Sequence, residues 1–502
     1  MGIKTLAKQS SHYLAGQVAM MALGFASFPI FTRVLSLADY GTIDLIQRLV
    51  LLGTALGKLG VQNAVIRFYE SQSKSGAPSA LRGHVSSAVV GTTLSGLLVG
   101  VILSGIFFYA SPAGPANYLM AAFAGLLALV RIEQAIFQNV LRVEERTGLY
   151  TITTVGTRVL TLAAIFGLFF LRGKGLETYF AGTIAVEALV ILALGLWLWR
   201  RGLLGWTGMD WTMFRTMVAF GAPLIAFECL TVMMDAGDRV LIRYFLGADS
   251  LGLYTAAFAL CIYIHDLMMV PINMALTPLY LKIWTNEGAE RTSAFLGQSF
   301  RLYVMAVGGL FAGVVVCAHD AVIVLASSKY AQSATLVPWI AGGMFLYAAN
   351  SFFNAGMVIH KRTKALAWFS LTIVVFKVVA NSLLLPRLGL TGAVISTVCA
   401  YVLFMALTAR ASLPLLPLQL NPATLLRAAV ACLLACAAGS VWRIESHYVG
   451  FLVRGASAVV VYVAVLAALD REARGYMSKG WLILRKQATW RPASQLAGRT
   501  TR

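Results

Sequence analysis

Runs of roughly 20 apolar residues, separated by short polar links, follow one another along almost the whole chain. A helix needs about that length to cross a bilayer, because the hydrocarbon core is about 30 Å thick and an α-helix rises about 1.5 Å per residue. The spacing predicts about 14 membrane-spanning helices, within 12–199, 216–410 and 425–469. The expected fold class is therefore an all-α integral membrane protein.

Composition agrees with this prediction, since 59% of the residues are hydrophobic, only 12% are charged and the mean hydropathy is +0.78. The spans use up nearly all 502 residues, which leaves no room for a soluble catalytic domain. We therefore expect a transporter and not an enzyme. The net charge of +20 does not indicate a nucleic-acid partner, because the basic residues gather in short links and in the tail, as membrane topology requires.

The basic links alternate along the chain, and this alternation predicts the orientation of the protein. Lys and Arg are enriched in the links that lie on the side of the N-terminus. The enriched side is the cytoplasmic one, so both termini are expected in the cytoplasm.

A short repeat indicates an internal duplication. Arg33 and Asp39 follow the first span with the same spacing as Arg243 and Asp249 after the seventh. Transporters built from such repeats commonly bind their substrate between the halves. The predicted divisions are a six-helix lobe over 1–205, a second over 206–412, two further helices over 413–470 and a basic cytoplasmic tail over 471–502. The tail suits a segment that lies on anionic lipid.

Ionisable side chains inside the spans are the candidate functional residues. Each costs about 2.5–3.5 kcal/mol at the membrane centre, so it usually faces a partner or a water-filled cavity. The basic candidates are Arg48, Lys58, Arg131, Arg158, Arg239 and Lys377, and the acidic residues are Asp44, Glu133, Glu187, Glu228, Asp235, Asp238 and Asp266.

Several of these residues fall on one face of their helix at about 100° per residue. Such stripes occur in the second, fourth, fifth and seventh spans, around Arg48, Arg131, Arg158 and Arg239. They predict a shared cationic cavity and hence an anionic cargo, because the planar guanidinium suits phosphate. The alternative is that the charges pair with one another and hold helices together, as the i,i+4 spacing of Asp44 with Arg48 and of Asp235 with Arg239 allows.

The acidic members of the stripes are candidates for ion coupling through protonation or Na⁺ binding. They are Glu228, Asp235 and Asp238, of which Glu228 lies nearest the middle of its span. No Cys or His spacing indicates a metal site, and no cofactor is expected beyond a coupling ion, H⁺ or Na⁺.

Short and mostly interhelical motifs resemble the polysaccharide flippases of the multidrug/oligosaccharidyl-lipid/polysaccharide exporter superfamily. They are residues 28–41, 221–223, 238–254 and 386–393, and the resemblance runs over roughly residues 5–410. It implies a V-shaped bundle of two lobes that alternates between inward- and outward-open states. The implied cargo is an undecaprenyl-diphosphate-linked oligosaccharide, moved across the bacterial inner membrane for the synthesis of O-antigen, capsule or exopolysaccharide. Membrane lipids, a glycan polymerase and chain-length machinery are the implied partners.

Two other readings remain. A multidrug or cation antiporter of the same superfamily would favour an acidic or apolar cavity and commonly has twelve spans. A membrane-embedded glycan-modifying enzyme such as an acyltransferase would need a catalytic histidine, and His265 is the only one well inside a span. Asp266 follows it directly, but neighbours in a helix face different ways, so we expect His265 to have a packing role and no residue to be catalytic.

Overall fold

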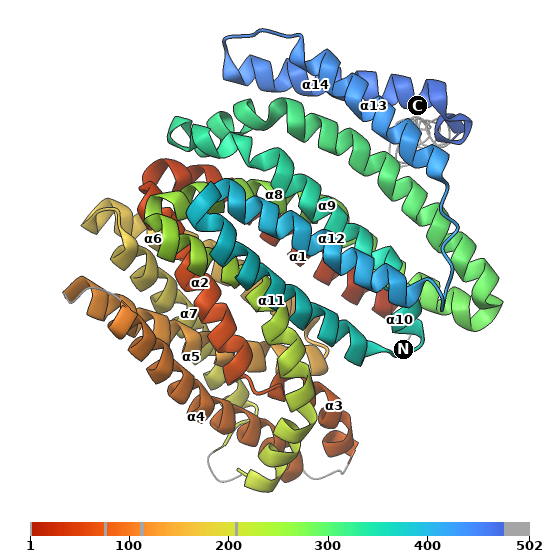
Figure 1. The fold of residues 1–502 in the computed structure, drawn as a ribbon. Helices are drawn as coiled ribbons and strands as arrows, with labels where there is room; N and C mark the ends of the chain where they lie inside the picture. The colour runs from red at the N-terminus through yellow and green to blue at the C-terminus, as the bar shows by residue number, and fades with distance from the viewer. Residues whose placement is uncertain (1–2, 75–77, 111–114, 206–208, 476–502) are drawn as a thin grey trace, which may run out of the picture.

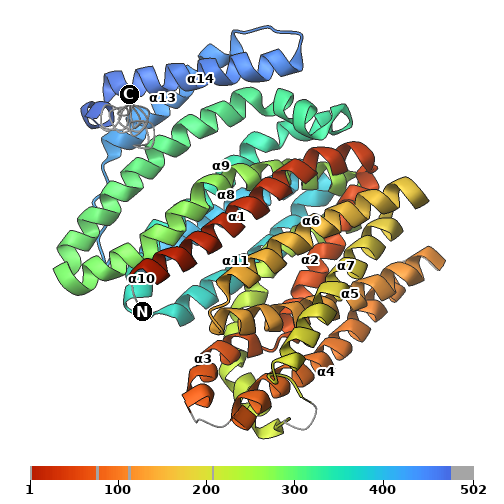
Figure 2. The ribbon, with the colours of Figure 1, turned by 180° about the vertical axis from the view of Figure 1, so that it is seen from behind.

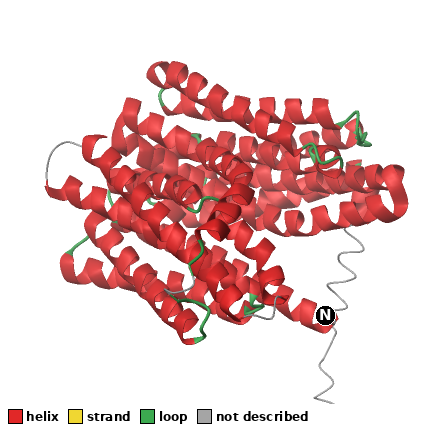
Figure 3. Ribbon diagram, turned by 90° about the horizontal axis from the view of Figure 1, so that it is seen from below, coloured by secondary structure: helices red, strands yellow, loops and turns green. Residues whose placement is uncertain are grey.

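The computed structural model describes residues 3–74, 78–110, 115–205 and 209–475, and helices are the regular elements throughout these ranges (Figures 1 and 3). The predicted first lobe, residues 1–205, contains α1 (Ile3–Val34), α2 (Leu37–Gly57), α3 (Val61–Lys74), α4 (Pro78–Ala110), α5 (Pro115–Val143), α6 (Thr147–Arg172) and α7 (Leu176–Arg200). The predicted second lobe, residues 206–412, contains α8 (Trp211–Ala321), η2 (Val322–Ala326), η3 (Ser328–Thr335), α9 (Val337–Phe353), α10 (Ala355–Ile359), α11 (Thr363–Leu388) and α12 (Leu390–Ser412). Two further helices follow, α13 (Pro422–Ser440) and α14 (His447–Leu469).

The longest element, α8, is not one straight rod. Its 111 residues would extend over roughly 165 Å, about five times the thickness of the hydrocarbon core. Gly247 and Gly288 interrupt it with φ values of 85° and 83°, in the left-handed region that glycine adopts without a steric penalty. The two breaks divide α8 into three stretches, 211–246, 248–287 and 289–321, and Figure 1 shows them running in different directions.

By length and composition, 10 helices of the described part can cross a membrane, or 12 if each of two bent pairs counts as one span. That count takes α8 once, although its stretches are each long enough to cross. The all-α membrane fold is thus confirmed, whereas the number of fourteen spans stays a prediction.

The two lobes lie side by side, with α4 to α7 on one side and α9, α11 and α12 on the other (Figure 1). Figure 2 shows α1 along α6, and α13 and α14 lie at the far edge against α8. The predicted boundaries at 205, 412 and 470 fall at the link before α8, at the end of α12 and just after α14. Most of the predicted basic tail, from residue 476 on, lies outside the described residues.

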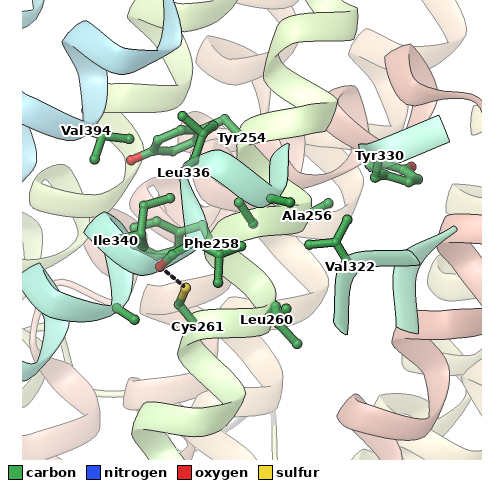
Figure 4. Packing of buried hydrophobic residues seen from close by; sticks show 14 of the residues in the cluster. Tyr254, Ala256, Phe258, Leu260, Cys261, Val322, Tyr330, Leu336, Ile340 and Val394 are labelled. Carbon is green, nitrogen blue, oxygen red and sulfur yellow. Dashed lines mark hydrogen bonds between the residues drawn. The ribbon is translucent and has the colours of Figure 1, made fainter. Parts of the chain in front are cut away.

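The core of the second lobe forms where the middle stretch of α8 meets η2, η3, α9 and α12. Tyr254 and Phe258 pack there with Leu336, Ile340 and Val394 (Figure 4). Lipid is itself apolar, so close packing of this kind holds membrane helices together where the hydrophobic effect does not. This core fixes the positions of the side chains that α8 turns toward α2.

Candidate functional site

The two lobes meet along a seam, which we define as residues 41–60 of the first lobe against residues 221–252 of α8. Its two ends are backbone contacts between glycines. A Cβ on Gly41 would meet the backbone of Gly252, and a Cβ on Gly60 would meet that of Gly221. Gly60, in the break between α2 and α3, also has φ of 70°, a conformation that other residues adopt only with strain. The ion pairs of the site lie between these two contacts.

Near the first end of the seam, Asp44 of α2 accepts a hydrogen bond from the Nε of Arg239 at 2.9 Å. Arg239 is fully buried, and its guanidinium lies 4.2 Å from the ring centre of Phe258. Arg48 contacts Asp44 at 3.4 Å and reaches across the seam to Asp235 at 3.8 Å. A buried guanidinium needs such a partner, because an unpaired charge in this environment is very unfavourable.

Near the other end, Lys58 forms an ion pair with Glu228, and the amide of Gln62 donates to the second oxygen of the same carboxylate at 3.1 Å. Lys58 and Gln62 flank the break between α2 and α3, whereas Glu228 belongs to α8. One carboxylate of the second lobe therefore holds two groups of the first.

Two further pairs lie inside single lobes. In the first lobe, the guanidinium of Arg131 on α5 donates to both oxygens of Glu187 on α7, each at 3.1 Å, and to Gln47 at 2.5 Å. In the second, Lys377 of α11 lies 2.7 Å from Asp238 of α8.

The Asp238 carboxylate is 1% exposed and also accepts hydrogen bonds from Asn381, Tyr254 and Thr397, at 2.7, 3.2 and 3.2 Å. Both carboxylate oxygens therefore have donors within the protein, and Lys377 has its counter-charge in Asp238.

Arg158 differs from the other predicted cations. Among the described residues, no carboxylate lies within ion-pair distance of it. Its guanidinium donates to the Ser27 hydroxyl of α1 at 3.4 Å, and it interacts electrostatically with the hydroxyls of Tyr179 and Tyr263. Tyr263 belongs to the middle stretch of α8, so Arg158 lies where α6, α1 and the second lobe meet.

The structure therefore pairs five of the six predicted cations with acids and brings the seam residues of both lobes together. Local pairing was foreseen for Arg48 with Asp44, and it occurs. For Arg239 the i,i+4 reading is wrong in detail, because its guanidinium bonds the backbone carbonyl of Asp235, at 2.6 Å, and the carboxylate of Asp44. The side chains of Glu228 and Asp235 keep 33% and 37% exposure, so these two coupling candidates are within reach of water.

Sequence reasoning missed two features. Glu187 was noted as an intramembrane acid, but its partner could not be read from helical spacing. The second is an apolar groove of about 780 Å³ between the last stretch of α8, α9, α12 and α13, lined by residues such as Phe311, Trp339 and Leu433. Its lining residues come from four separate elements, which no local pattern joins.

One expectation about His265, the histidine considered as a catalytic residue, is wrong. The Nδ1 of His265 lies 2.9 Å from the carboxylate of Asp266, so these neighbours do contact each other, contrary to the expectation that they face apart. In the described part of the chain no group of three or more His, Cys, Asp or Glu side chains could hold a metal ion.

Comparisons with known proteins identify the family and the fold of the chain. The family model described as polysaccharide biosynthesis protein matches residues 6–284. No curated protein sequence matches the chain significantly. Among solved structures, the lipid II flippase MurJ in an inward closed conformation has a TM-score of 0.73 at 12% identity, and the alignment covers 91% of this chain and 99% of that one.

Two multidrug transporters are also similar in fold. An inward-facing MATE family transporter of the MOP superfamily has a TM-score of 0.57 at 13% identity, covering 82% of this chain and 94% of its own. A mutant of the MATE transporter VcmN of Vibrio cholerae has a TM-score of 0.51 at 16% identity, with 82% and 97% covered. These neighbours are transport proteins and not enzymes, as we expected of this chain. The fold is similar to that of MurJ and of the MATE transporters, and the family match over more than half of the sequence shows that the chain belongs to the polysaccharide biosynthesis protein family.

Proposed function

We propose that this protein is a flippase that moves a lipid-linked oligosaccharide diphosphate across the bacterial inner membrane for the synthesis of a surface polysaccharide. The observation that carries the proposal is Arg158, a cation at membrane depth beside the second lobe without a carboxylate partner in the described structure. A guanidinium there is costly unless a ligand or water meets its charge. The diphosphate of the cargo is such a ligand, and Arg binds phosphate through two parallel hydrogen bonds.

The paired cations of the seam extend this mechanism. A diphosphate that enters between the lobes competes with Asp235 and Glu228 for Arg48 and Lys58, because all three are anions that seek the same donors. Exchange of protein carboxylates for cargo phosphate separates the lobes at that point. The lipid tail stays in the apolar phase, for which the groove along α9 and α13 offers a matching surface. Rocking of the lobes then exposes the headgroup on the other side.

The test is translocation of a fluorescent undecaprenyl-diphosphate oligosaccharide in proteoliposomes. Arg158→Ala loses one charge-assisted hydrogen bond to the cargo, which contributes about 1.5–3 kcal/mol. Its translocation rate should therefore be lower by about tenfold or more. Arg158→Lys should retain part of the activity because it keeps the charge. Arg172→Ala is the matched control, since Arg172 lies exposed at the end of the same helix. Translocation by Arg158→Ala at the rate of the unsubstituted protein would contradict the proposal.

A second candidate is a cation antiporter, and one observation favours it. The seam carboxylates Glu228 and Asp235 are more exposed than the cations they pair with, Lys58 and Arg48. An exposed acid between lobes can bind a cationic drug. Efflux of a fluorescent organic cation from loaded proteoliposomes distinguishes the two functions. The flippase proposal predicts that the cation is not exported and that it does not inhibit translocation of the lipid-linked oligosaccharide.

A further inference from the structure

Glu133 of α5 is a buried carboxyl group that the transport mechanism above does not use. Its side chain is 7% exposed, and it faces α4, where the hydroxyls of Thr92 and Thr93 each lie 3.1 Å from Oε1. The other oxygen, Oε2, is buried and has no hydrogen-bond partner. Within the described part of the chain, no Lys, Arg or His lies within ion-pair distance of this carboxyl group.

The hydrogen bonds around Glu133 indicate which form of the carboxyl group is present. Each threonine hydroxyl has one proton, and each lies closer to a backbone carbonyl, at 2.8 Å from that of Ala88 for Thr92 and from that of Val89 for Thr93. With these protons directed to the carbonyls, an ionised carboxylate would be left without a full donor on either oxygen. A protonated carboxyl instead donates its own proton to a threonine oxygen, which still has an acceptor lone pair. The neutral acid therefore leaves only a carbonyl oxygen, Oε2, without a partner, whereas the ionised form leaves a buried negative charge without one.

The ionisable groups of the surrounding elements do not offset a negative charge at Glu133. Those nearest along the packed faces have partners of their own, since Lys58 pairs with Glu228 and Glu187 with Arg131, and His84 hydrogen-bonds the carbonyl of Val65. The other described ionisable groups on α2, α3, α4, α5, α6 and α7 and in the break after α2 are Asp39, Tyr40, Asp44, Arg48, Lys58, Arg67, Tyr69, Glu70, Arg82, His84, Tyr109, Tyr118, Arg131, Arg142, Tyr150, Arg158, Arg172, Glu177, Tyr179, Glu187 and Arg200. None of these described groups is a hydrogen-bond or ion-pair partner of Glu133.

The site is joined to the end of the seam. Ser95, which follows the two threonines on α4, donates to the carbonyl of Gly57 at 2.6 Å. Ile132, the neighbour of Glu133, lies against Gly57 so closely that a Cβ there would overlap its side chain. Gly57 is the last residue of α2 and precedes Lys58, which holds Glu228 of the other lobe. Movement of this end of α2 therefore displaces the elements that enclose Glu133.

We propose that Glu133 is a proton-binding site whose occupancy is coupled to the separation of the two lobes. The inference rests on the proposed transport function and names H⁺ as its coupling ion. With the lobes in contact, Glu133 is enclosed and holds a proton. When Lys58 leaves Glu228 and the end of α2 moves, water reaches the carboxyl group, the proton passes to that water, and the carboxylate is hydrated. Return to the enclosed state requires a proton from solution, so one proton crosses with each cycle if the two openings face opposite sides.

The first measurement detects the protonation of Glu133 independently of transport. Infrared difference spectra of the purified full-length protein in nanodiscs, recorded between acidic and alkaline buffer, should contain the carbonyl band of a protonated carboxylic acid. Glu133→Gln should remove that band, and Glu187→Gln, the control at a buried acid with an Arg partner, should leave it. Glu133→Met, of similar size, serves if the Gln variant does not fold. A band that persists in the Glu133 variants would overturn the assignment of the proton to this residue.

The second measurement tests whether protonation of Glu133 is coupled to the separation of the lobes. Spin labels on the two lobes report the closed-to-open ratio, which should rise as the pH falls, by at most about tenfold per pH unit for one bound proton. In Glu133→Gln the ratio should be independent of pH, because the amide imitates the neutral acid throughout. A pH dependence that is the same in both proteins would show that Glu133 is only a helix-packing acid and overturn the coupling. Absence of glycan-lipid translocation by the unsubstituted protein, with both other readouts as expected, would refute the flippase function and leave the proton site standing.

Discussion

Lys58 of the first lobe forms an ion pair with Glu228 of the second, and it lies two residues before Gly60, whose backbone contacts that of Gly221. The pair is only partly shielded from water, since the Glu228 side chain is 33% exposed. Partial exposure keeps the attraction modest, and a modest attraction suits a contact that has to break in every transport cycle.

Removal of this pair should favour open lobes. Glu228→Gln keeps the shape of the side chain and loses the charge, and a pair of this exposure contributes about 1 kcal/mol, which corresponds to roughly a fivefold change in the open-to-closed ratio. Distances between spin labels on α3 and on the first stretch of α8 measure it. Glu287→Gln is the control, because Glu287 pairs with Arg291 within one exposed segment. An unchanged distance distribution in Glu228→Gln would show that the pair does not hold the lobes.

The glycine contact should be more sensitive to size than to charge. In Gly221→Ala the new methyl group meets the backbone of Gly60, so this end of the seam cannot close as it does here. Gly237→Ala, on the same stretch of α8, meets nothing within 4 Å and should behave as the unsubstituted protein. Cross-linking of cysteine pairs across the seam should fall in the first variant only. Equal cross-linking in both would contradict the close approach of the two backbones.

The buried pair of Asp238 and Lys377 should contribute to stability as a unit. Asp238→Ala leaves a buried ammonium without its partner, which should cost about 3–5 kcal/mol. Replacing both residues by apolar ones, Asp238→Leu with Lys377→Met, should recover only part of that loss, because Asn381, Tyr254 and Thr397 also lose their acceptor. Thermal unfolding in detergent, followed by tryptophan fluorescence, measures both. An unfolding temperature of Asp238→Ala equal to that of the unsubstituted protein would contradict the prediction. It would show that water hydrates the Lys377 ammonium group and that the pair lines a water-filled cavity.

The attachment of α14 should depend on pH through Asp470, which follows the membrane-spanning part of that helix. Burial alone would raise the pKa of this carboxyl, but the backbone N–H of Ala473 and the guanidinium groups of Arg427 and Arg301 outweigh burial and hold the pKa below its usual value. A lowered pKa in the folded state stabilises the protein above the ordinary value of about 3.9, and this stabilisation is lost as the pH falls through the folded pKa.

We therefore expect protection from hydrogen exchange at the end of α14 to fall progressively as the pH drops below about 4 toward the lowered pKa of Asp470. Asp470→Asn should show the faster exchange already at neutral pH and lose the pH dependence. Exchange that is equally slow in both proteins at neutral pH would mean that Arg301 and Arg427 do not anchor α14 through this residue.

The sequence predicted the helices well because lipid leaves few alternatives, and a run of apolar residues in a membrane has to be a helix or part of a closed barrel. It also marked the ionisable residues inside the spans, since each is rare at membrane depth. Helical spacing identified the face on which Arg131 lies, but not that α7 would place Glu187 opposite it, because the partner is 56 residues away. For Arg239, a carboxylate from the other lobe replaced the local partner that spacing suggested. Charges at a helix interface pair with what packing brings near, and packing is not a local property.

Contact between glycine backbones at both ends of the seam affects binding strength as well as motion. A cargo that enters between the lobes has to find them apart, so its apparent dissociation constant equals the intrinsic one divided by the fraction of molecules that are open. Tight chemical recognition and weak measured affinity are therefore compatible in this protein. A substitution that loosens either glycine contact should make the same site bind more tightly without touching a single group that meets the cargo.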